Sequence, residues 1–170
     1  MRAVLSNGGG RCEDGDGVTI VVWLTEGTWP ACVDAARALP ADPVRLLHVV
    51  DAHSVEAIDG AHAGLLGRAA GAGGAEMLRQ AQTALLDAAA ARLGRPAERV
   101  ARRGAVEREV VAACADADLL ILARDGDRTR LGPKSLGRTT RFVLDHAPCP
   151  VLLVWPDAPP GLSTLPPPPR

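Results

Sequence analysis

The segment that decides the fold runs from residue 117 to residue 155 and reads ADLLILARDGDRTRLGPKSLGRTTRFVLDHAPCPVLLVW. A short apolar run, Leu119–Ala123, stands near its start, and a second one, Val151–Trp155, stands at its end. Between them lie a long polar loop and a helical pattern over about Leu136–His146. Runs this short and this apolar are typical of strands covered on both faces. The segment therefore predicts two parallel buried strands joined by a helical crossover.

The same alternation continues toward the N-terminus. We expect further strands at Val18–Leu24, Val44–Val50 and Glu98–Arg102. We expect further helices at Ala31–Leu39, Ala75–Leu93 and Val106–Ala117. Five strands alternating with four helices predict an α/β fold with a doubly wound parallel sheet. Ligands of such sheets bind beyond the carboxyl ends of the strands, which directs attention to residues 25–28, to the segment from Val50 onward and to residues 124–140.

The chain divides into one domain and two flanking segments. Its 170 residues favour a single domain, which we place at residues 18–156. Residues 1–17 are rich in Gly, Asp and Asn and are expected to form a flexible lead-in. Residues 157–170 end in a run of four prolines, so we expect a disordered, extended tail outside the core.

Charge and composition narrow the class of partner. The net charge is −1, so no global field attracts nucleic acid or an anionic membrane. The chain has no apolar run near the ~20 residues of a membrane span and no signal-peptide pattern. We therefore expect a cytoplasmic protein without nucleic-acid or membrane partners. The cysteines form no CxxC pair and predict no metal site; they are Cys12, Cys32, Cys114 and Cys149.

The opening segment resembles the C-terminal half of universal stress proteins. The matching features are Asp118-Leu119-Leu120, Leu136-Gly137 and the APCPVLLV run of residues 147–154. The resemblance extends over about residues 18–156. It implies an adenine-nucleotide alpha hydrolase-like fold, a five-stranded sheet of order 3-2-1-4-5. It also implies a homodimer formed through the last strand, whose residues are Val151, Leu152, Leu153, Val154 and Trp155.

Some members of that family bind ATP, and the resemblance makes ATP with Mg²⁺ a candidate ligand. Their loop after the fourth strand carries G-x2-G-x9-G-[ST], because small residues let the backbone approach phosphates next to a helix N-terminus. Here only the third glycine, Gly137, is kept, and the first two positions hold Arg124 and Asp127. The candidate nucleotide or anion site comprises Thr25, Glu26, Gly27, Val50, Arg124, Gly126, Asp127, Gly137, Arg138, Thr139 and Thr140.

The loop from Arg124 to Arg141 admits two interpretations. It carries a local cluster of basic side chains, and arginine forks in it can replace a backbone cradle for anions. Alternatively it is a solvated loop in which Asp125 and Asp127 serve as counter-charges. Asp127 opposes ATP in the usual pose, because like charges repel.

Three functional hypotheses follow. We find no GxSxG elbow, no GK[ST] loop and no GxGxxG after the first strand, so the first is a non-enzymatic regulatory or stress-response module. The second is an adenine-nucleotide-binding stress protein that uses the Arg-rich loop, with at most slow ATP hydrolysis. The third is a dimeric scaffold in which Pro166–Pro169 dock a protein partner.

His48, inside an apolar strand, is interpreted as a satisfied core histidine.

Overall fold

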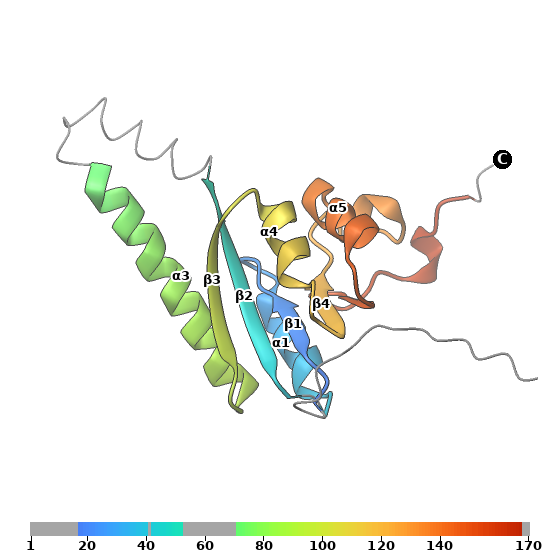
Figure 1. Ribbon diagram of the computed structural model, residues 1–170. Coiled ribbons are helices and arrows are strands. Elements are labelled where there is room, and N and C mark those ends of the chain that lie inside the picture. The colour runs from blue at the N-terminus through green and yellow to red at the C-terminus, as the bar shows by residue number, and fades with distance from the viewer. Residues whose placement is uncertain (1–16, 41, 53–70, 168–170) are drawn as a thin grey trace, which may run out of the picture.

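The computed structural model describes residues 17–40, 42–52 and 71–167, so the predicted lead-in lies outside the described residues except for Gly17. Its centre is a sheet of five parallel strands in the order β3-β2-β1-β4-β5. The strands are β1 Ile20–Trp23, β2 Val44–Asp51, β3 Glu98–Gly104, β4 Leu119–Ala123 and β5 Val151–Val154. The predicted doubly wound sheet and its 3-2-1-4-5 order are thereby confirmed (Figure 1).

Helices cover both faces of the sheet. They are α1 Trp29–Arg37, α3 Gly71–Leu93, α4 Val106–Ala113 and α5 Arg138–His146, with short 3-10 turns η1 Pro133–Ser135 and η2 Leu162–Thr164. Figure 1 shows α3 on one side of the strands and α4 with α5 on the other. Helix α1 packs with α3 in one core cluster, and α4 packs with α5 in the other.

The central strands are apolar throughout because each face lies against helices. Along β1, Ile20 and Val22 belong to the cluster under α1 and α3, whereas Val21 and Trp23 belong to the cluster under α4 and α5. All four side chains are buried. This two-sided burial is what a continuous apolar run in a parallel sheet predicts.

Several boundaries differ from the expected ones by a few residues. Strand β1 begins at Ile20, and Val18 is 49% exposed. Helix α3 begins at Gly71, four residues before the expected Ala75. Helix α4 ends at Ala113 rather than Ala117. The amides that follow donate to carbonyls three residues earlier, as in a 3-10 turn; for example, the Cys114 amide donates to the Val111 carbonyl. Among the described residues, no helix is long and apolar enough to cross a membrane.

The segment after β5 follows a defined path as far as Pro167. The sequence predicted disorder for residues 157–170, whereas the described part, through residue 167, includes the turn η2 and lies beside the loop after β4. The Leu131 amide donates to Thr164 Oγ1 at 3.1 Å, and Arg128 pairs with Asp157 at 2.9 Å. These contacts tie the tail to the loop.

Candidate functional site

A cleft of about 390 Å³ opens at the carboxyl ends of β1 and β2. Its walls come from the ends of these two strands, from α3 and from the first residue of α4. Three predicted site residues line it, namely Thr25, Glu26 and Val50. The cleft occupies the position where doubly wound sheets bind ligands.

His48 places an unsatisfied polar atom in this cleft. The residue is only 9% exposed, and its Nδ1 has no hydrogen-bond partner among the described residues. Burial lowers the pKa of His48, and the Glu26 carboxylate raises it in part. The lowered pKa favours the neutral ring, whose Nδ1 is itself buried from solvent. The burial expected of a core histidine is confirmed, whereas no partner for Nδ1 lies among the described residues.

Gln82 fixes helix α3 against the strand ends. Its Nε2 donates to the His48 carbonyl at 2.9 Å and to the Arg102 carbonyl at 3.2 Å, which joins α3 to both β2 and β3. The helix interior offers no sequence signal for this contact. The cleft wall formed by α3 is thereby held in place.

The turn after β1 is held by two threonines. The Thr25 and Thr28 hydroxyls lie 2.5 Å apart, and the Thr25 carbonyl accepts from the Thr28 and Trp29 amides. Gly27, a predicted site residue, adopts φ +76°, which favours glycine. Thr28 precedes α1 as expected but makes no side-chain capping bond, because its hydroxyl is used in the turn.

The loop after β4 is closed on itself. The Gly126 amide donates to the Ser135 carbonyl at 3.0 Å, and the Asp127 amide donates to the Lys134 carbonyl at 2.8 Å. The two halves approach so closely that a Cβ on Gly126 would lie 2.4 Å from the Lys134 oxygen. Gly126 and Asp127 thus contribute their backbone amides to loop closure.

Arg124 is directed into the same loop. Its guanidinium donates to the Ser135 hydroxyl and lies 4.6 Å from the centre of the Trp155 ring. Ser135 is fully buried, and its hydroxyl donates to the Gly132 carbonyl at 2.7 Å. The cation–π contact and the hydrogen bond together hold Arg124 inside the protein.

The N-terminus of α5 is occupied by a carboxylate of the chain. The Gly137 amide donates to Asp125 Oδ1 at 2.6 Å, and a Cβ on Gly137 would lie 2.6 Å from Oδ2. A helix N-terminus attracts anions through its free amides and its dipole. Asp125, considered from sequence only as a counter-charge, fills this position.

The remaining α5 candidates lie elsewhere. Arg138 and Thr139 line a second groove, of about 610 Å³, to which Glu107 of α4 also contributes, and Thr140 is a buried residue of α5. None of the loop or α5 candidates lines the cleft that contains Thr25 and Val50. The predicted site residues therefore divide among the cleft, the closed loop and the α5 surface.

The described cysteines are free thiols. Cys32 and Cys114 are buried, Cys149 is half-buried, and Cys12 lies outside the described residues. Burial raises the pKa of Cys32 and of Cys114 to about 12. Within the part of the chain that the structure describes, no group of three or more ligating side chains could hold a metal ion.

The sheet order and the cleft beyond its strand ends define the class of doubly wound α/β domains with the alpha hydrolase-like arrangement. Residues 31–154 match the model of the Universal stress protein family, and the chain belongs to that family. No curated protein sequence matches the chain significantly.

Solved structures share this fold. The hypothetical protein MJ0577 is 22% identical with a TM-score of 0.62, and the alignment covers 81% of this chain and 95% of that one. The hypothetical protein PH0823 is 17% identical with a TM-score of 0.58, over 81% and 95% of the two chains. A universal stress protein solved in complex with cAMP is 20% identical with a TM-score of 0.52, over 83% and 98%.

Proposed function

We propose that this chain is a non-enzymatic regulatory member of the universal stress protein family whose cleft takes an uncharged ligand of nucleoside size. In this proposal the loop after β4 does not hold the phosphates of ATP. The observation that carries it is the hydrogen bond from the Gly137 amide to the Asp125 carboxylate. A phosphate entering at this helix N-terminus would meet a fixed negative charge.

The other candidate anion contacts of the loop are also used internally. Of the six basic side chains between residues 124 and 141, four have partners within the protein. Arg124 bonds Ser135, Arg128 pairs with Asp157 at 2.9 Å, and Arg130 pairs with Asp127 at 3.6 Å. Arg141 donates to the Pro133 carbonyl at 2.7 Å. Holding a triphosphate would require several of these contacts to break.

The cleft has the chemistry of a site for a hydroxyl-bearing neutral molecule. Its volume of about 390 Å³ lies within the ~300–1,000 Å³ typical of small-molecule pockets. The Glu26 carboxylate can accept hydrogen bonds from vicinal hydroxyls, as acidic residues do for ribose. His48, whose pKa is lowered by burial, adds an uncharged polar ring to the lining of the cleft.

The alternative function is an adenine-nucleotide-binding stress protein that uses the Arg-rich loop. The structural neighbour solved with cAMP supports including it in the test. This alternative requires Asp125 to leave Gly137 and Arg124 to leave Ser135 before phosphates bind.

An amide NMR titration with adenosine, with AMP as the comparison, tests the proposal. We expect adenosine to shift the Thr25, Glu26 and Val50 signals and AMP to bind no more tightly, because none of the described residues that line the cleft is an Arg or a Lys. Glu26→Gln should weaken adenosine binding about tenfold or more, a loss of ~1.4 kcal/mol. Glu107→Gln, an acid outside the cleft, is the matched control. AMP binding tenfold tighter than adenosine, with shifts in residues 124–138, would favour the alternative.

We further propose that the chain acts in the cytoplasm as a homodimer paired through β5. Strand β5 is an edge of the sheet, and Leu152 on it is 37% exposed. Sedimentation should give a dimer that Leu152→Asp dissociates, whereas Met77→Asp on exposed α3 should leave it intact. A monomeric native chain would refute this pairing.

A protein partner docked on the Pro-rich tail remains a separate proposal. Deleting residues 157–170 should abolish recovery of such a partner in a pull-down. Unchanged recovery would remove the tail from that role.

A further inference from the structure

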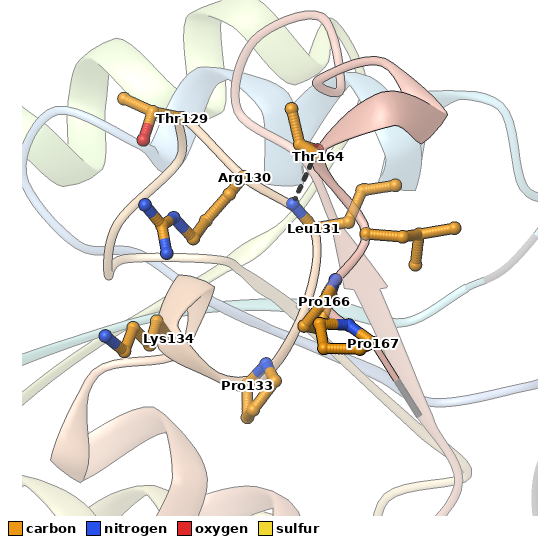
Figure 2. Close-up of a pocket in the computed structure, with 9 residues that line it drawn as sticks. Thr129, Arg130, Leu131, Pro133, Lys134, Thr164, Pro166 and Pro167 are labelled. Carbon is orange, nitrogen blue, oxygen red and sulfur yellow. Dashed lines mark hydrogen bonds between the residues drawn. The ribbon is translucent and has the colours of Figure 1, made fainter. Parts of the chain in front are cut away.

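Another cavity lies between the loop after β4 and the tail, separate from both the cleft at β1 and β2 and the groove at α5. Its volume is about 490 Å³, within the ~300–1,000 Å³ typical of small-molecule pockets. The loop supplies one wall through residues 129–134, and the tail supplies the other through residues 164–167 (Figure 2). None of the described residues of the cleft at β1 and β2 lines it.

The tail wall is held in place at successive points. Trp155 lies beneath Arg124, Asp157 pairs with Arg128, and Thr164 accepts from the Leu131 amide. In these three pairs, residues later in the loop contact residues later in the tail. The tail therefore runs parallel to the loop. The cavity is therefore built by two tethered segments.

The lining combines positive charge with an apolar surface. Figure 2 shows Arg130 and Lys134 on one side, with Leu131 and Pro166 on the other. None of the described residues that line the cavity carries a carboxylate. Leu165, also in the lining, is 58% exposed. Exposed apolar side chains beside charged groups are typical of surfaces that bind a ligand.

We propose that this cavity binds an amphipathic anion, a single carboxylate or phosphate carried on a short apolar chain. The Arg130 and Lys134 side chains receive the anionic group, and Leu131, Leu165 and Pro166 cover the chain. Arg130 pairs with Asp127 at 3.6 Å, a long and exposed contact that an incoming anion can share. The tail lies beyond residues 31–154, which match the family model. The proposal does not depend on the ligand of the cleft.

Three probes with the same alkyl chain test this proposal on the full protein: octanoate, octyl phosphate and octanol, each below its aggregation concentration. Amide NMR would follow Leu131 and Thr164, which face the cavity. We expect at least one of the two anions to shift these signals and to bind at least tenfold more tightly than octanol. The tighter anion identifies which headgroup the site prefers.

Substitutions locate the charge effect. Arg130→Gln with Lys134→Gln should weaken anion binding tenfold or more and leave octanol unchanged. Arg37→Gln with Arg108→Gln removes the same charge elsewhere and should have little effect. Octanol binding as tightly as both anions, equal losses in the two double variants, or no shift at Leu131 and Thr164 with any probe would overturn the proposal.

Discussion

The Asp125 carboxylate accepts a hydrogen bond of 2.6 Å from the Gly137 amide, across eleven intervening residues of the loop after β4. This contact caps helix α5 from outside its own sequence, since the N-cap residue, Gly137, has no side chain. Asp125→Ala should therefore lower the free energy of unfolding by about 1 kcal/mol, a typical cost for a lost cap. Urea denaturation at neutral pH measures this change.

Asp145→Ala is the matched control for that prediction. Asp145 lies in the last turn of α5, where a carboxylate opposes the helix dipole. Its removal should be neutral or slightly stabilising. An equal loss in both variants would show that Asp125 does not act as a cap.

Gly126 should tolerate no side chain. A Cβ there would lie 2.4 Å from the Lys134 carbonyl oxygen and 2.8 Å from the Ser135 carbonyl carbon. The two halves of the loop would therefore have to move apart. Gly126→Ala is expected to cost about 1–3 kcal/mol, as overpacking does. Gly161→Ala, whose nearest contact would be 3.7 Å from a side-chain oxygen, should change stability by less than about 0.5 kcal/mol. Similar denaturation midpoints for the two variants would contradict the closed loop.

The hydroxyl of Thr164 should protect the Leu131 amide from exchange. Thr164→Val removes the acceptor of the 3.1 Å bond and also the bond to the Gly161 carbonyl. Because a hydrogen bond contributes about 1 kcal/mol, exchange at Leu131 should accelerate about fivefold. Thr164→Ser keeps the hydroxyl and should exchange like the native protein. Unaltered exchange in Thr164→Val would show that the tail does not hold the loop.

His48 should make stability depend on pH. Burial lowers its pKa below the ordinary value of 6.5, so the unfolded chain binds the proton more readily. The contribution of His48 to the free energy of unfolding is complete above pH 6.5. It is lost progressively as the pH falls toward the pKa of His48 in the folded protein. Denaturation midpoints should therefore fall as the pH is lowered from 6.5 toward the folded pKa. His48→Leu should remove this part of the pH dependence.

Glu26→Gln provides the directional check on His48. The Glu26 charge raises the pKa of His48, so its removal should lower that pKa further and extend the acid-sensitive window. Ring NMR titration of His48 reports the shift. A pKa that rises in Glu26→Gln would contradict the electrostatic account of the cleft.

The strand order followed from sequence because the apolar runs are local signals and the family resemblance supplied their arrangement. The loop after β4 was predictable in length but not in its contacts. The Asp125–Gly137 bond depends on a fold-back that no periodicity reveals. That His48 Nδ1 has no partner among the described residues depends on what surrounds it in space. The tail composition favoured disorder, whereas Thr164 and Asp157 bind the loop.

Calorimetric titration of the native protein with Mg·ATP beside adenosine tests the central claim, that Asp125 closes the α5 N-terminus to phosphates. The account predicts heat with adenosine, and Mg·ATP binding at least tenfold weaker or absent at millimolar concentration. Mg·ATP binding near or below ~10 µM, about −7 kcal/mol, would contradict it. In that case the arginines of the loop must exchange their internal partners for phosphate.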